Sequence, residues 1–229
     1  MKKSTVASLL IFLLLIPATM YLGNQLPGRK YYITATLLII ELMIPFFLSF
    51  EGRKPQAREL VLVAVLCALA IAARVAIPIP HFKANYAVIM LAGAAFGFQN
   101  GFIVGAISAF ASNFFYTQGA FTPWQMIGYG IAGMLFGLLF DKCRIPAKSW
   151  LMAIIGFAVV VFVVGPILDS IAIFMGLARP SLKSFLAFFA SGFAVNCSLG
   201  LATAFCLLAF GKPMMAILDR IKLKYGVLQ

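Results

Sequence analysis

The segment from Asn113 to Met126 holds the side chains of this chain that are best suited to binding a small molecule. It reads Asn-Phe-Phe-Tyr-Thr-Gln-Gly-Ala-Phe-Thr-Pro-Trp-Gln-Met, so amides and hydroxyls are mixed with aromatic rings. Amide and hydroxyl groups need hydrogen-bond partners wherever water is scarce, and the flanking sequence is apolar and rich in glycine. We therefore expect a bound ligand or a neighbouring helix to supply those partners.

Two carboxylates lie within apolar stretches, where an ionisable group is a functional candidate by default. Glu41 could carry protons or could bond to a neighbouring helix. Asp169 follows a Gly-Pro pair and could face a substrate cavity or pair with a basic residue such as Arg74 or Arg179. Asn196 lies in Phe-rich sequence, where interhelical bonding and ligand contact are both open to it.

Motifs for catalysis and metal binding are missing from the sequence. It contains no GxxxxGK[ST], HExxH or GxSxG pattern and only six acidic residues, so the chain cannot hydrolyse ATP by itself and we assign no catalytic residue. His81 is the single histidine and has no cysteine at ligand spacing, so no metal site is expected. The four cysteines show no CxxC spacing, and three of them lie in apolar segments, where cysteine behaves as a small hydrophobic residue.

The composition is that of a polytopic membrane protein. Of 229 residues 63% are hydrophobic and 10% charged, and the mean hydropathy is +1.05. The formal net charge of +12 comes from Lys and Arg residues spread thinly between apolar runs, which is not the pattern of a nucleic-acid-binding protein.

The positions of proline, glycine and charged residues divide the chain into candidate membrane-spanning helices of about 20 residues. The Met-Lys-Lys start resembles a signal peptide, but no small-x-small cleavage site follows, so we interpret the first apolar run as a retained span. Eight spans are predicted, near 5–22, 31–50, 57–77, 84–99, 101–117, 122–140, 149–175 and 183–210.

The distribution of positive charge predicts the orientation. With a cytoplasmic N-terminus, twelve of the eighteen Lys and Arg residues fall on the inner side, as the positive-inside rule requires. Both termini are then cytoplasmic. The loops around 78–85, 117–123 and 176–182 open on the outer side, where an external ligand arrives.

The third predicted span carries a ladder of small residues at intervals of four. This alanine ladder consists of Ala64, Ala68, Ala72 and Ala76. Small-residue faces let another helix approach closely in a membrane, so the ladder predicts either packing within the chain or docking onto a separate membrane subunit. Gly130, Gly133 and Gly137 in the sixth span form a similar face, for which we expect internal packing.

The segment 113–126 followed by Gly130-Ile-Ala-Gly133 resembles the substrate-binding S components of energy-coupling factor (ECF) vitamin transporters, and is most similar to their cobalamin-specific members. The resemblance implies an all-α integral membrane protein of the bacterial cell membrane. Residues 56–229 are then a six-helix core with a short cytoplasmic tail, and residues 1–55 are an extra pair of transmembrane helices. It further implies a membrane-embedded T component that docks on the alanine ladder, and two ABC-type ATPase subunits that supply the energy.

On this basis we expect a substrate-specificity subunit that carries cobalamin as transported substrate and binds no resident cofactor. A corrin ring needs apolar and aromatic surface, and its peripheral amides need hydrogen-bond groups. The predicted substrate contacts are His81, Asn85, Asn113, Tyr116, Gln118, Phe121, Thr122, Trp124, Gln125, Asp169 and Asn196. The alternatives are another substrate of the same family, a standalone secondary transporter that uses Glu41 and Asp169, and a structural subunit of a membrane complex.

Overall fold

The structure is a computed structural model. It describes residues 10–24, 57–77, 79–119, 121–176 and 181–226. Between residues 33 and 44 it also describes Ile33, Thr34, Leu37, Leu38, Ile40, Glu41 and Ile44. Every regular element in these ranges is a helix, as the sequence predicted.

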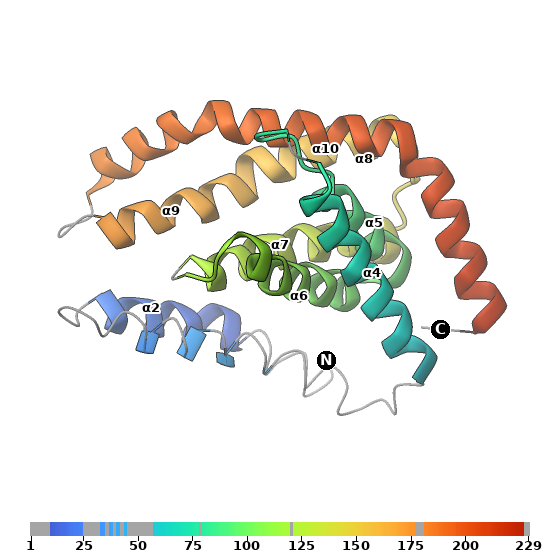
Figure 1. The fold of residues 1–229 in the computed structure, drawn as a ribbon, viewed down its shortest axis with the longest axis horizontal. Coiled ribbons are helices and arrows are strands. Elements are labelled where there is room, and N and C mark those ends of the chain that lie inside the picture. Colours follow the sequence, from blue (N-terminus) through green and yellow to red (C-terminus); the bar gives the residue numbers. More distant parts are fainter. Residues whose placement is uncertain are drawn as a thin grey trace.

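The described elements are α-helical and π-helical segments, and several π-helical segments continue directly into an α-helix (Figure 1). They are η1 (Ile11–Leu15), α2 (Ile16–Asn24), α4 (Ala57–Val75), α5 (Asn85–Phe96), α6 (Phe98–Tyr116), α7 (Thr122–Phe136), η3 (Gly137–Lys142), α8 (Ser149–Val159), η4 (Val160–Val164), α9 (Gly165–Gly176) and α10 (Leu182–Tyr225). In Figure 1, α10 runs along the top beside α8 and α9, α5 to α7 fill the centre, and α4 crosses them obliquely.

Helices occupy each of the six ranges predicted for the core, but they differ in length. Among the described residues, three helices are long and apolar enough to cross a membrane: Thr122–Lys142, Ser149–Ser170 and Leu182–Lys224. Asn85–Phe96 is a shorter apolar helix. The number of membrane crossings and the division at residue 55 therefore stay predictions, and most of the predicted span 31–50 lies outside the described residues.

The last helix corrects the sequence prediction. The Gly211-Lys-Pro sequence predicted an end near residue 210, yet α10 continues through Pro213 to Tyr225. Proline removes one backbone hydrogen bond and bends a helix without always ending it, and α10 does bend toward its C-terminus (Figure 1). Leu218, beyond the proline, is buried, and this packing holds the added turns.

Glycines bring α5, α6 and α7 into backbone contact. A Cβ at Gly133 of α7 would overlap the carbonyl group of Gly101 in α6, and a Cβ at Gly93 of α5 would overlap the carbonyl of Gly133. A Cβ at Gly137 would likewise overlap the backbone of Phe98. The prediction that the glycines of this span pack internally is confirmed. The contact fixes the ends of these three helices relative to one another.

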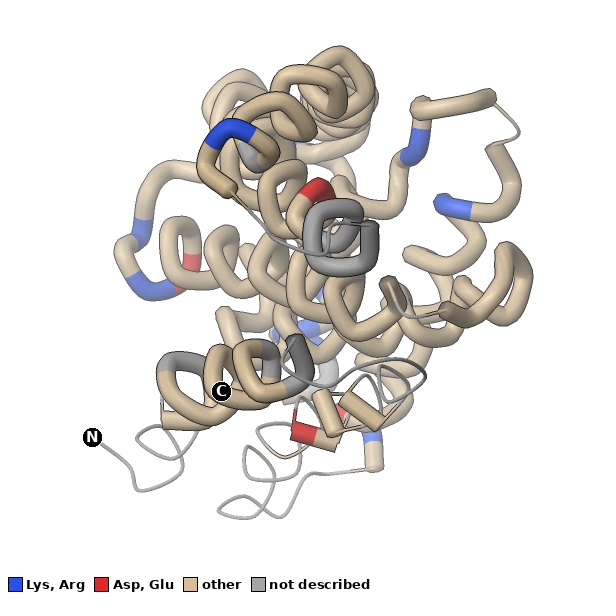
Figure 2. The backbone as a smooth tube through the Cα atoms, turned by 90° about the vertical axis from the view of Figure 1, so that its left-hand side faces the viewer, with Lys and Arg blue, Asp and Glu red and all other residues tan. Residues whose placement is uncertain are grey.

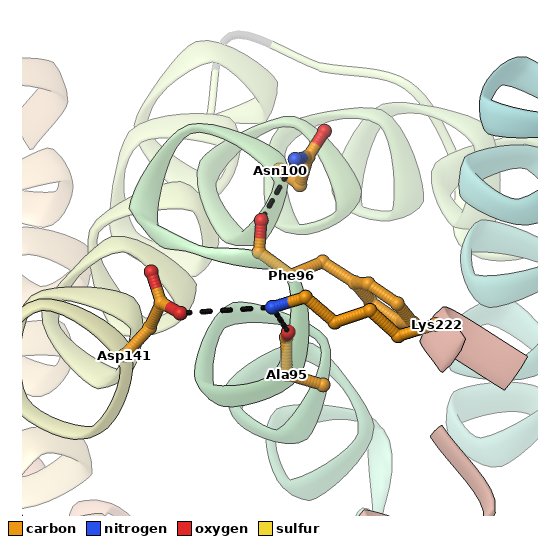
Figure 3. A network of polar contacts seen from close by, with 5 residues as sticks. All are labelled: Ala95, Phe96, Asn100, Asp141 and Lys222. Carbon is orange, nitrogen blue, oxygen red and sulfur yellow. Dashed lines mark hydrogen bonds and ion pairs between the residues drawn. The ribbon is translucent and has the colours of Figure 1, made fainter. Parts of the chain in front are cut away.

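One end of this three-helix layer is held by what we call the Lys222 network: Ala95, Phe96, Asn100, Asp141 and Lys222 (Figure 3). The last carbonyls of a helix have no partner within the helix. Here Lys222 Nζ donates to the Ala95 carbonyl (3.0 Å), and Asn100 Nδ2 donates to the Phe96 carbonyl (2.8 Å). Asp141 Oδ1 lies 3.8 Å from Lys222 Nζ, so the network ties α10 to α5 and η3.

Charged residues are sparse throughout the described chain. In the backbone tube of Figure 2, acidic and basic positions are short, separate segments along a chain of otherwise uncharged residues. In the N-terminal part, Thr19 Oγ1 donates a hydrogen bond to Glu41 Oε1 at 2.5 Å. A bond from Glu41 to a neighbouring helix was one of the two possibilities that the sequence left open.

Candidate substrate-binding site

The opposite end of α5, α6 and α7 carries most of the predicted polar contacts. It also receives the last turn of α4 and the segment that leads into α5. We call the following residues the Arg74 cluster: Arg74, Lys83, Ser112, Asn113, Tyr116, Gln118, Thr122 and Gln125. Three of them, Ser112, Asn113 and Thr122, are fully or almost fully buried.

Asn113 is the centre of the cluster. Its Oδ1 accepts a hydrogen bond from Arg74 Nη1 (2.9 Å), and its Nδ2 donates to Gln125 Oε1 (2.8 Å) and to Thr122 Oγ1 (3.2 Å). One amide thus joins α4, α6 and α7, which explains how an asparagine with no exposed surface keeps its hydrogen bonds. Arg74 also donates to the hydroxyl of Ser112.

The turn between α6 and α7 is built by its own polar side chains. Thr122 Oγ1 donates to Gln118 Oε1 (2.9 Å) and accepts from the Gly119 N–H (3.2 Å). Pro123 then occupies the first turn of α7, where its missing N–H costs nothing. These contacts place Gln125 one turn along α7, facing Asn113.

Aromatic rings surround the Arg74 guanidinium. Its Cζ lies 5.0 Å from the ring centroid of Tyr116 and 5.4 Å from that of Tyr129, within the range of cation–π attraction. Tyr129 in turn meets the Tyr86 ring edge-on at 4.7 Å. The Tyr116 hydroxyl donates to the Arg74 carbonyl at 3.0 Å, so the ring is fixed against the end of α4.

Asn85 is the one predicted contact whose amide is buried and unsatisfied. It begins α5, two residues after Lys83 and directly before Tyr86, and is 1% exposed. Neither Nδ2 nor Oδ1 has a hydrogen-bond partner among the described residues. Buried amides are nearly always paired, so an unpaired one indicates a missing partner such as a ligand or a water molecule.

The remaining predicted contacts of this end differ in exposure. Trp124 is buried, Phe121 is half-buried, and Tyr116 and Gln118 are exposed. His81 is exposed in the turn between α4 and α5.

Asp169 and Asn196 form a separate pair. Asn196 Nδ2 donates to Asp169 Oδ2 at 2.8 Å, and Asn196 is 4% exposed. This bond joins α9 to α10. Of the basic partners considered for Asp169, Arg74 lies instead in its own cluster, and Arg179 lies outside the described residues.

The alanine ladder lies on the surface. All four of its alanines are exposed, and Ala64 and Ala68 line a groove of about 370 Å³ on the side of α4. The other lining residues are Leu60, Val63, Cys67, Ile71 and Ile107. The described part of the chain therefore leaves this face open.

Three members of the Arg74 cluster were not predicted as contacts: Arg74, Lys83 and Ser112. Arg74 and Ser112 are 38 residues apart, so only the packing of α4 on α6 reveals their bond. The sequence did contain one indication of this bond. Arg74 is a charged residue near the end of a long apolar helix, and a charged side chain in a membrane protein needs a polar neighbour.

The fold and the site define a helical membrane protein with a polar, aromatic cluster at one end of its helices and an open small-residue face along α4. Residues 54–212 match the family model of the ECF-type riboflavin transporter S component. Because this match covers more than half of the chain, the chain belongs to that family of transporter subunits. Comparisons with curated proteins and with solved structures give no significant match.

Proposed function

We propose that this chain is the substrate-specificity subunit of an ECF-type importer and that the Arg74 cluster, together with Asn85, binds the vitamin. The observation that carries the proposal is the Asn85 amide, which is buried without a hydrogen-bond partner beside a cluster of amides, hydroxyls and aromatic rings. A ligand with polar edges would satisfy both atoms. Family membership supports the transport role.

Cobalamin is the proposed substrate, because the cluster offers amide groups for peripheral amides and aromatic rings for a large apolar face. Riboflavin is the second candidate, since the matching family model carries its name. The vitamin would act as transported substrate, with no resident cofactor and no catalytic step on this chain.

The proposed partner is a membrane-embedded T component, with two ABC-type ATPases supplying the energy. The exposed alanine ladder and the groove beside it are the proposed docking face, because small side chains let a partner helix approach closely. We further propose a bacterial cell membrane location with both termini in the cytoplasm. The Arg74 cluster would then open outward.

The alternative of a secondary transporter relies on Glu41 and Asp169 as ion-coupling groups. Each already accepts a hydrogen bond, from Thr19 and Asn196 respectively. The bond to Asn196 gives Asp169 a structural role, which favours the capture subunit, whereas Oε2 of Glu41 is buried without a hydrogen-bond partner among the described residues.

The test is calorimetric titration of cobalamin, riboflavin and pantothenate into the detergent-purified chain without ATPase subunits. Saturable one-to-one binding is expected for one vitamin. Trp124→Ala should weaken that binding, whereas Trp150→Ala, which alters an exposed tryptophan at the start of α8, should not. Absence of saturable binding for all three vitamins would contradict the proposed site.

A further inference from the structure

We propose that the Arg74 cluster binds an anionic group of the substrate, a carboxylate or a phosphate, between Arg74 and Lys83. This inference rests on the proposed function and adds a substrate class to it. It starts from the positions of two cations that converge on a single aromatic ring.

Arg74 and Lys83 both face Tyr116. Arg74 Cζ lies 5.0 Å and Lys83 Nζ 5.7 Å from the centroid of its ring, and Lys83 Nζ is 3.4 Å from its hydroxyl oxygen. Two like charges gathered in this way repel each other, and the repulsion grows as water is excluded. An anion bound between Arg74 and Lys83 would attract both cations and offset their mutual repulsion.

Acidic residues of the described chain do not form an ion pair with either cation. Asp141 pairs instead with Lys222, at the opposite end of α5, α6 and α7. The described acids are distributed as follows: Glu59 in the first turn of α4, Asp141 in η3, Asp169 bonded to Asn196, Asp219 late in α10, and Glu41 bonded to Thr19. The Arg74 cluster thus contains two positively charged side chains and no acidic one.

Arg74 retains donors for such a ligand. A guanidinium has five N–H groups, and the two bonds of Arg74 to described residues both start from Nη1. Arg74 is half-buried, so it is partly desolvated and still reachable. A planar guanidinium with free donors matches a carboxylate or phosphate in a two-bond geometry. Lys83, whose Nζ donates to the Ile77 carbonyl at 2.6 Å, adds a second charge at a fixed position.

The inference separates the two candidate vitamins. Cobalamin contains a phosphodiester, whereas riboflavin has no anionic group at neutral pH. The cluster charge therefore favours cobalamin over riboflavin, and it favours phosphorylated or carboxylated ligands over their neutral counterparts.

The experiment compares ligand pairs that differ in one anionic group, titrated into the detergent-purified full chain at low and high salt. The pairs are cobinamide phosphate with cobinamide, riboflavin 5′-phosphate with riboflavin, and pantothenate with pantothenol. For the pair built on the vitamin that the chain binds, the anionic member should bind about 10- to 100-fold more tightly than the neutral one. High salt should reduce this ratio of affinities. The phosphate and carboxylate pairs distinguish the two kinds of anion.

Variants assign the preference to its residues. Arg74→Gln and Lys83→Gln should each reduce the ratio between anionic and neutral ligand toward one, and Arg74→Lys should keep part of it. Lys142→Gln is the matched control, because Lys142 also faces an aromatic ring, Phe98 at 5.9 Å, but at the far end of the helices. A purely structural role for Arg74 would weaken both members of a pair equally and leave the ratio unchanged.

The outcomes separate this inference from the proposed function. If a vitamin binds saturably and its anionic and neutral forms bind equally, the anion site is wrong while the capture subunit stands. If no ligand of any pair binds, the capture subunit is wrong and the anion site falls with it.

Discussion

Replacing Asn85 with leucine tests whether the buried, unpaired amide is a ligand contact. The side chain is 1% exposed, and both of its polar atoms lack partners among the described residues. Leaving a buried polar group unsatisfied costs about 1–3 kcal/mol. Leucine has a similar size and no polar atom, so Asn85→Leu removes that penalty. We expect the ligand-free protein to become more stable by about 1–3 kcal/mol.

The same substitution should weaken vitamin binding. A ligand that bonds to the amide loses those bonds in Asn85→Leu, and its own polar groups then lie against an apolar side chain. Net hydrogen-bond contributions of about 0.5–1.5 kcal/mol each predict a loss of affinity of about 5- to 150-fold for two bonds. Stability and affinity therefore change in opposite directions.

The assay combines thermal unfolding in detergent with calorimetric titration of cobalamin and riboflavin. Asn196→Leu is the matched control, because it removes another buried amide, 4% exposed, whose Nδ2 is bonded to Asp169 at 2.8 Å. That change leaves a carboxylate without its donor and should lower the melting temperature. If Asn85→Leu lowers it as well, the Asn85 amide is satisfied in the protein, and the reasoning that places a ligand there is refuted.

Three further predictions concern packing and docking. Gly133→Ala should destabilise the protein strongly in thermal unfolding, since its Cβ would overlap the Gly101 carbonyl, whereas Gly128→Ala, with its nearest neighbour at 3.4 Å, should be tolerated. Ala68→Leu should reduce co-purification with a T component and spare vitamin binding. The control Ala209→Leu, at an exposed alanine of α10, should change neither. Intact co-purification of the Ala68→Leu variant would contradict docking on the alanine ladder. Lys222→Met should lower the free energy of unfolding by about 1–3 kcal/mol, because it leaves the Ala95 carbonyl without its donor, and an unchanged unfolding curve would refute that role.

Local sequence identified the polar side chains that come together at the turn between α6 and α7. Asn113, Gln118, Thr122 and Gln125 come together because one turn between two helices brings them within hydrogen-bond reach. Apolar runs and their punctuation also predicted six ranges in which the structure has helices. These features depend on short-range spacing, which a sequence displays directly.

Contacts between distant helices could not be predicted in the same way. The bond from Arg74 to Asn113 spans 39 residues, and the one from Asn196 to Asp169 spans 27, so each depends on how two helices cross. Asn196 lies with Asp169, apart from the Arg74 cluster, through the interhelical bonding that the sequence left open, and its contact with a ligand stays a prediction. The length of α10 was missed for a different reason, since Pro213 marks the end of a helix unless packing beyond it compensates for the lost hydrogen bond.

The position of α4 connects the two proposed functions of the chain. Its side carries the alanine ladder, and its last turn carries Arg74, two residues after Ala72. A partner helix on the ladder, as proposed, would act on the same helix whose end bonds to Ser112 and Asn113 of α6. Backbone contact through glycines holds α6 against α5 and α7, so a displacement of α4 relative to these helices would alter the Arg74 bonds. Docking and substrate release would then be linked by this one helix.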